Sequence, residues 1–396
     1  MFQAHFRFEI HRYILFFTFF LFVTKWIKNT RVNTNQLIFL IFIIIYVFYG
    51  ILIGKSTLYS SSSAIVFYSF MFYHFLINAS KDVTLKINNQ FKKIYILYLL
   101  ALILEIIINY SYGWEYLNNY FPGGPGITGY RSLESRTFIG IFNINISGLN
   151  SLILGPQASS MITLSALIWF FPLFKDHSSL RNIHVNKKWF FISFLFFMLS
   201  PTMTANLLFI IFIIIAFFLL KGSIYNSFKS KIVLATIVAT GGIIILKFLF
   251  THLFNPYQLS RYTWGFTEII YAFNKLPIKH QLFGIPAYQK IGDFTATIEF
   301  GFYRLFFDLG FLFVFIIFVI LTIVFYKIIR SPQVKNRISN FYLSSAKRNI
   351  IIVMIWFLSL MHYQPALEIG AVQLIAFHLS VALLNFNRSK QLSLKY

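Results

Sequence analysis

The chain has 396 residues, of which 58% are hydrophobic and only 11% are charged, and its mean hydropathy is +0.71. Soluble domains carry about 25% charged residues, so this composition excludes an ordinary soluble protein and indicates a polytopic membrane protein. The formal net charge of +23 is better explained by basic loops beside anionic lipid than by nucleic acid. The chain has no cysteine, which excludes disulfides and thiolate metal sites.

Eleven apolar stretches are candidates for membrane spans, which need roughly 17–25 residues. The first apolar run, Tyr13–Thr24, has no small-residue cleavage site, so we expect a membrane segment rather than a cleaved signal peptide. The expected spans are 10–25, 37–54, 61–79, 94–111, 158–174, 189–202, 204–220, 232–250, 302–326, 350–366 and 369–386. The sequence therefore predicts an all-α membrane protein of about 11 (10–12) spans, with residues 1–396 forming a single integral membrane domain.

In this eleven-span arrangement, the connections that are rich in basic residues all fall on the same side of the membrane. They gather in the connections 25–36, 80–93, 175–188, 221–231 and 327–349 and in the tail after residue 386. The positive-inside rule therefore makes these connections cytoplasmic. Two large loops, 112–157 and 250–301, are left on the external side, where we expect them to contain short helices. The N-terminus disagrees, because it would be external although it carries Arg7 and Arg12.

The first external loop turns sharply at its Gly- and Pro-rich residues 122–126 and then carries Arg131 and Arg136, with Glu134 between them. Two interpretations have equal weight. Both arginines could meet lipid phosphates at the interface, or one or both could bind a phosphate group inside a cavity. Arginine suits the second role, because its planar fork bonds phosphate oxygens in pairs and stays charged.

The stretch 250–310, which contains the second external loop, is polar between two strongly apolar regions, and its interleaved aromatic residues argue against disorder. We interpret it as a partly helical lid over a site at a membrane surface. Arg261 lies within it, while Arg304 and Asp308 are four residues apart and could form an ion pair on one helix face. Glu299 is either a solvated residue at a helix start or a general base that takes a hydroxyl proton.

Three ionisable residues fall in or near the expected spans: Glu105, His362 and His378. Such residues are costly in a membrane and usually face a bundle interior or a wet cavity. For Glu105 we favour a buried partner of a basic side chain, and for His362 a functional role. His378 could equally be a packed polar contact. A P-loop pattern, HExxH and an external DxD pair are all absent, so we expect no ATP-driven step, no cofactor and no metal site.

Four stretches, in this order, resemble the Wzy-type O-antigen polymerase and O-antigen ligase families. They are RTFIGIFNINISGLNSLILGPQ (136–157), LSPTMTANLLFIIFIIIAF (199–217), the region 260–310 with SRYTWGFTEII, LFGIP and IEFGFYRLFFDLG, and MHYQPALEIGAVQLIAFH (361–378). They are similar, in turn, to an arginine-containing entry into a span, a tight central hairpin, the second large loop and a histidine-containing turn between the last two spans.

The resemblance implies a GT-C-like helical architecture in the bacterial cytoplasmic (inner) membrane, with the active site on the external, periplasmic side. It implies a metal-independent glycosyltransferase that moves a growing glycan from undecaprenyl pyrophosphate to the next lipid-linked repeat unit. Expected partners are these lipid-linked oligosaccharides, membrane lipids, a chain-length regulator and a flippase, and no nucleic acid.

The expected site residues are Arg131, Arg136, Arg261 and Arg304 for the pyrophosphate, and Glu299 and His362 for catalysis. Arginines can neutralise a departing pyrophosphate without a metal. Two alternatives stay open. One is a ligase that moves a finished glycan onto another acceptor, and the other is a flippase for lipid-linked oligosaccharides, although transporters usually show internal repeats that this sequence lacks.

Overall fold

The computed structural model describes residues 87, 89–104, 107, 111, 137–139, 144–147, 155–171, 182–198, 202–220, 239, 241–243, 267, 270–284, 301–332, 337–360 and 369–393. These residues are helical apart from connections and one short pair of strands. The prediction of a helical protein is therefore confirmed for this part of the chain.

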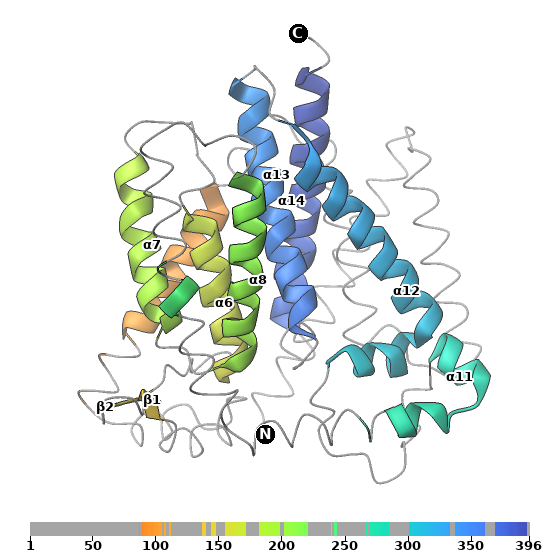
Figure 1. Cartoon of the computed structure of the whole chain (residues 1–396). Helices are drawn as coiled ribbons and strands as arrows, with labels where there is room; N and C mark the ends of the chain where they lie inside the picture. Colours follow the sequence, from red (N-terminus) through yellow and green to blue (C-terminus); the bar gives the residue numbers. More distant parts are fainter. Residues whose placement is uncertain are drawn as a thin grey trace, which may run out of the picture.

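A bundle of helices forms the centre of the molecule (Figure 1). It contains α6 (Gly155–Phe170), α7 (Asn182–Met198), α8 (Met203–Leu220), α13 (Arg337–Ser359) and α14 (Ile369–Ser393). These helices consist mainly of apolar residues. They contain one proline, Pro156, which lies in the first turn of α6, where a missing N–H breaks no helical hydrogen bond. Helical residues 89–104 pack against α6 and α14 through aromatic contacts.

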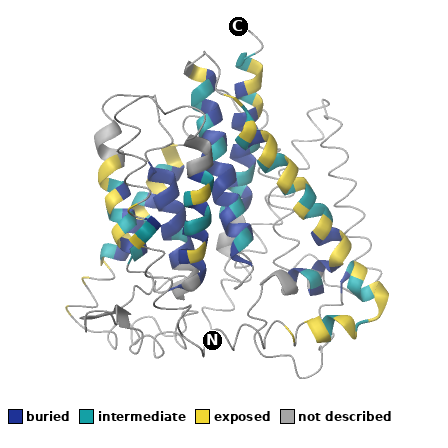
Figure 2. Cartoon of the chain, viewed as in Figure 1, coloured by how far each residue is buried: buried dark blue, intermediate teal, exposed yellow. Residues whose placement is uncertain are grey.

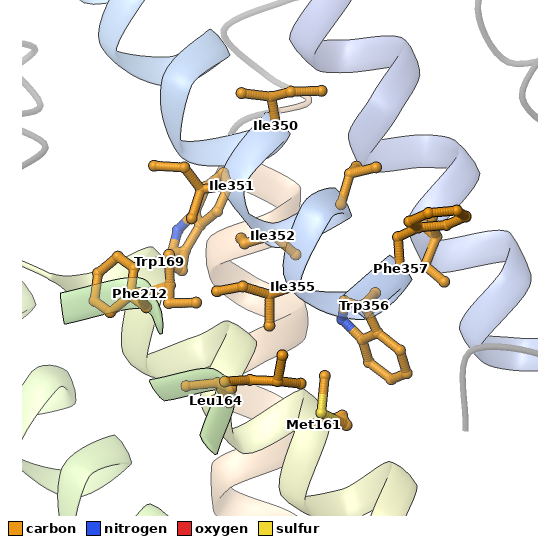
Figure 3. Close-up of a cluster of buried hydrophobic side chains, with 14 of the residues drawn as sticks. Met161, Leu164, Trp169, Phe212, Ile350, Ile351, Ile352, Ile355, Trp356 and Phe357 are labelled. Atoms are coloured by element: carbon orange, nitrogen blue, oxygen red, sulfur yellow. The ribbon is translucent and has the colours of Figure 1, made fainter. Parts of the chain in front are cut away.

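The core of the bundle lies where α6, α8 and α13 meet (Figures 2 and 3). Leu164, Phe212, Ile352 and Trp356 are all buried there. The indole N–H of Trp356 would be left without a partner in such a place, but it donates to Ser165 Oγ on α6 over 2.7 Å. Apolar packing and this one hydrogen bond together fix how α6 and α13 face each other.

A row of polar side chains joins α13 to α14. Ser339 Oγ donates to the Ser389 carbonyl oxygen over 2.9 Å, and Ser389 Oγ donates back to the Ser339 carbonyl oxygen over 3.0 Å. One and a half turns further along, Asn385 Nδ2 donates to Ser345 Oγ over 2.9 Å. We call these four residues the polar seam. Because all of them are buried, their pairing sets the register of the two helices.

The polar seam corrects the expected connection 327–349. The structure continues α12 to Arg330 and starts α13 at Arg337, so most of the expected connection is helix. Within the expected connection, Ser339 and Ser345 are buried against α14. The span expected at 350–366 therefore starts too late. Its helix ends at Ser359, and residues 361–368 lie outside the described part of the chain.

Some of the other expected spans match helices of the structure, and some lie outside the described residues. The spans 158–174, 189–202, 204–220 and 369–386 correspond to α6, α7, α8 and α14. Only part of 94–111 and four residues of 232–250 are described, and 10–25, 37–54 and 61–79 lie outside the described residues. Among the described helices, two are long and apolar enough to cross a membrane, Leu309–Arg330 and Ile338–Ser359. The count of about eleven spans stays a prediction.

Helix α12 (Gly301–Arg330) stands apart from the bundle and leans onto α13 (Figure 1). Phe318 of α12 packs on Phe357 of α13, with 6.2 Å between the ring centroids. In the most apolar window of α12 only 28% of the residues are buried, against 72% in that of α13. The backbone of α12 is broken at Gly310, which has φ 78° and ψ 162°. The helix therefore consists of a short first part and a long second part.

A two-stranded antiparallel pair lies in the first large loop, where we expected short helices. It consists of β1 (Thr137–Ile139) and β2 (Ile144–Ser147), with Thr137 opposite Ser147 and Ile139 opposite Ile144. The β-branched residues in these stretches favour strand over helix. Arg136 directly precedes β1 in the sequence and lies outside the described residues.

Candidate functional site

Most of the residues that the sequence proposes for the site fall outside the described part of the chain. These are Arg131, Arg136, Arg261, Glu299 and His362. The same holds for Glu105, which we expected to be a buried ionic partner. The roles given to these residues therefore stay predictions.

Arg304 is the predicted site residue that the structure places on an element. It lies one turn into the first part of α12, and Asp308 lies one turn further along the same helix. The helical backbone confirms the spacing that an ion pair between them requires. The ion pair itself stays a prediction.

The first part of α12 is held against residues 270–284, which belong to the second large loop. Residues 270–274 are helical and lead through a turn into α11 (Ile278–Phe283). Phe273 packs on Phe306 and Phe307, with centroid distances of 6.1 and 5.8 Å. We call Ile270–Gly284 the 270–284 segment (Figure 1).

Two glycines make the contact between this segment and α12. Gly284 ends α11 with φ 86° and ψ 171°, and Gly310 breaks α12 with φ 78° and ψ 162°. This region of φ and ψ is essentially restricted to glycine. A Cβ on Gly310 would lie 2.3 Å from the Leu282 carbonyl oxygen and 2.4 Å from the Gly284 nitrogen, so the backbones touch directly there. The break thus fixes the 270–284 segment at the start of the long part of α12.

Short hydrogen bonds keep the 270–284 segment in shape. Gln281 Nε2 donates to the Leu276 carbonyl oxygen over 2.8 Å, and the Gly284 N–H donates to the His280 carbonyl oxygen over 2.8 Å. His280 Nδ1 lies 3.2 Å from the Gly284 carbonyl oxygen. With its imidazole turned to its own backbone, His280 serves as a cap at the end of α11.

A second cluster of polar side chains surrounds His378 on α14. Tyr95 Oη lies 2.7 Å from His378 Nε2, and Asn349 Oδ1 lies 2.6 Å from His378 Nδ1. The imidazole stacks on Phe91, with 4.0 Å between centroids and 12° between planes. These contacts come from three separate parts of the chain, so His378 ties residues 89–104 and α13 to α14.

The proton positions in this cluster follow from its partners. Asn349 Nδ2 donates to the Ser345 carbonyl oxygen over 2.7 Å, which turns Asn349 Oδ1 toward His378. Because a carbonyl oxygen only accepts, His378 Nδ1 carries the proton and Nε2 accepts from Tyr95. Both nitrogens are occupied and the ring is fully buried. A general acid or base must reach a substrate proton, so His378 is a packed polar contact, one of the two roles open to it from the sequence.

Removing this contact is expected to destabilise the bundle. His378→Leu leaves Asn349 Oδ1 buried without its imidazole partner, at about 1–3 kcal/mol, while Tyr95 Oη keeps Ser165 beside it. We expect a lower unfolding temperature of the purified protein in detergent. An unchanged unfolding temperature in His378→Leu would contradict the role of this contact.

Three cations on α12 and α13 have partners that hold their charge. Arg348, in the middle of α13, is buried with its guanidinium 4.7 Å above the Trp169 ring of α6. Lys347 Nζ donates to the Ser331 carbonyl oxygen over 2.9 Å and so closes the short connection between the two helices. The Arg330 side chain donates to Tyr326 Oη and lies on that ring. The positive charges of these side chains are thus stabilised by aromatic rings and a backbone oxygen.

Some of these residues were missed by the sequence reasoning. Tyr95 and Asn349 carry no signal of their own, because only the three-dimensional packing brings them to His378. Gly310 does carry one, since a glycine inside a long apolar run often marks a break. Among the described residues, no group of three or more histidine and carboxylate side chains is placed to hold a metal ion.

Comparison with known proteins adds no relative. The chain matches no protein-family model, no curated protein and no solved structure.

Proposed function

We propose that this protein polymerises lipid-linked oligosaccharide repeat units at the external face of a bacterial cytoplasmic membrane. The donor is a growing glycan on undecaprenyl pyrophosphate, and the acceptor is a hydroxyl of a single lipid-linked repeat unit. The acceptor oxygen forms a bond to the anomeric carbon, the bond from that carbon to the pyrophosphate breaks, and the acceptor proton passes to a base. The glycan grows by one unit, and undecaprenyl pyrophosphate leaves.

The observation that carries the proposal is that the polar second large loop and the basic residues of the connection to α13 lie at opposite ends of α12. The 270–284 segment and Arg304 lie at the start of this helix, on one side of Gly310. Lys327 and Arg330 lie in the last turn of α12, at its far end, and Lys347 of α13 reaches the Ser331 carbonyl oxygen there (Figure 1). If α12 crosses the membrane with its basic end in the cytoplasm, the polar stretch 250–310 lies outside, which supports an external site.

In this mechanism, arginines do the work that a metal does in many other glycosyltransferases. Arg261 and one of Arg131 or Arg136 bind the donor pyrophosphate, and their positive charge stabilises it as it departs. Arg304 is a weaker candidate, because Asp308 lies one turn away on the same helix and competes for it. Glu299 or His362 takes the acceptor proton. No step uses ATP, since the pyrophosphate is already a good leaving group.

The decisive experiment is a gel of surface glycans from a strain that lacks this protein. A polymerase predicts the loss of long chains while forms with a single repeat unit persist. Long chains that accumulate on the lipid carrier without reaching their acceptor would instead identify a ligase. Repeat units trapped on the cytoplasmic face would identify a flippase. Either of the last two outcomes would overturn the proposal.

The topology gives a separate prediction. Reporter fusions at Asn118 and Lys279 should both report the external compartment, because the positive-inside rule places the basic connections, and not these two loops, in the cytoplasm. A reporter after Arg330 serves as the control and should report the cytoplasm. A cytoplasmic signal at both Asn118 and Lys279 would refute the arrangement and the site with it.

Metal dependence can be tested with purified protein. We expect polymerisation to continue in EDTA, because the arginines supply the charge that Mg²⁺ would otherwise supply. An activity that EDTA abolishes and Mg²⁺ restores would contradict the mechanism. An EDTA-sensitive metalloenzyme assayed in the same buffer is the control that chelation is complete.

A further inference from the structure

The 270–284 segment exposes apolar side chains beside two lysines. Ile278 is 73% exposed and Tyr271 is 60% exposed, and Ile270 and Leu282 are also exposed. Single exposed apolar residues are common on protein surfaces and need no explanation. Here, however, they lie together on a segment of fifteen residues that is itself packed on α12 through Phe273 and Gly284.

The apolar surface continues from this segment along α12. Phe273 packs on Phe306, which stacks on Phe311, which in turn stacks on Phe315. Both of these stacks have centroid distances of 6.0 Å, and the first of them, Phe306 on Phe311, crosses the break at Gly310. Phe311 and Phe315 are exposed. A row of rings thus joins the segment to α12, and both elements carry exposed residues (Figure 2).

The length of α12 places the segment at a definite height. The stretch Leu309–Arg330 has 22 residues, or about 33 Å of helix, close to the roughly 30 Å of a hydrocarbon core. At its far end, Tyr326 and Arg330 form the pair of an aromatic ring and a cation that is typical of a membrane interface. If α12 crosses a membrane, its near end at Gly310, where the 270–284 segment is attached, lies at the opposite interface.

The charge of the segment fits the same place. Residues 270–284 include Lys275 and Lys279 and no carboxylate. The Lys275 ammonium lies 4.1 Å from the centroid of the Tyr271 ring. At bilayer surfaces, tyrosine rings lie at the edge of the hydrocarbon, and lysine ammonium groups reach the lipid phosphates.

We propose that the 270–284 segment lies in the headgroup layer of an anionic lipid leaflet. Ile278 and Leu282 enter the boundary with the acyl chains, and Lys275 and Lys279 bind lipid phosphates. The segment is then a fixed membrane anchor for the second large loop, and it sets the height of α12 in the bilayer. The proposal depends on α12 crossing the membrane and not on glycosyl transfer, so its failure and the failure of the proposed function are distinguishable.

The absence of cysteine from the chain makes a direct test simple, because each cysteine variant of the whole protein carries a single spin label. The labelled positions are Ile278→Cys, its neighbour Lys279→Cys as the matched control, and Phe318→Cys for the middle of α12. The protein is placed in vesicles of phosphatidylethanolamine and phosphatidylglycerol. Depth is read from collisions with oxygen, which is enriched in lipid, and with a water-soluble nickel chelate.

The label at position 278 should lie about 5–10 Å below the phosphates. The label at position 279 should be shallower, and the label at position 318 deepest. Lys275→Gln with Lys279→Gln should move the label at position 278 outward in vesicles with phosphatidylglycerol and not in phosphatidylcholine alone.

Three results would overturn the proposal. One is a label at position 278 that is as open to nickel as the label at position 279, which would put the segment in water. Another is protection of position 278 from both reagents, which would mean that protein covers it. The third is nickel access at position 318, which would show that α12 does not cross the bilayer.

Discussion

Arg261→Ala is expected to stop chain growth while leaving the protein inserted and present at its normal level. An arginine that binds the departing pyrophosphate stabilises charge that develops in the transition state. Losing such a group costs about 10²–10³ in rate. Chain lengths on a gel of surface glycans, together with protein levels in the membrane fraction, measure both parts of the expectation.

Two further substitutions separate charge from geometry. Arg261→Lys keeps the positive charge but loses the planar fork, so it should still impair transfer. Arg330→Ala is the matched control, because this arginine contacts Tyr326 at the cation-rich end of α12, far from the 270–284 segment. Normal chain lengths in both Arg261→Ala and Arg136→Ala, at normal protein levels, would refute the pyrophosphate site. Both arginines would then be interfacial anchors.

Gly310→Ala is expected to detach the 270–284 segment from α12. A Cβ at this position would lie 2.3 Å from the Leu282 carbonyl oxygen, and φ 78° with ψ 162° is strained for any residue other than glycine. The strained backbone costs about 1–3 kcal/mol and the overpacking about as much again. We expect a lower unfolding temperature and faster tryptic cleavage after Lys275 and Lys279. Both side chains are already exposed, but trypsin cleaves only where the backbone around them can unfold, and the loosened segment allows that.

Gly242→Ala is the control for that experiment. A Cβ on this helical glycine would have no atom within 4 Å. Alanine should therefore be neutral there or stabilise the helix by up to about 1 kcal/mol. If Gly310→Ala matched the wild type in both unfolding temperature and cleavage rate, the direct contact between Gly310 and Leu282 would not be what holds the segment.

Hydropathy predicted where the apolar helices lie but not where they end. The span expected at 204–220 is almost the same as α8, because its residues are uniformly apolar. The span expected to begin at residue 350 belongs to a helix that begins at Arg337. A hydropathy window reads Ser339 and Ser345 as a loop, since it has no information on the partners that bury them on α14.

The candidate site was less predictable than the fold for a related reason. A single histidine in an apolar run shows that a polar group is buried at a cost in free energy, but it does not show whether that group is functional. The sequence therefore left two roles open for His378, and the contacts with Tyr95 and Asn349 in the structure decide between them. For Arg304, a helix and a four-residue spacing to Asp308 were predictable from the sequence, and both are present in the structure. Long polar loops gather their side chains by tertiary contacts, which no local pattern encodes.

The polar seam also bears on how the chain is made. If α14 crosses the bilayer over the expected span 369–386, a lone α14 would hold Asn385 in lipid without its partner, where an unpaired amide is costly. That partner, Ser345, lies on α13, which leaves the ribosome first. We therefore expect the nascent α13 to wait beside the insertion machinery until α14 arrives, so that the two helices enter the bilayer as a pair.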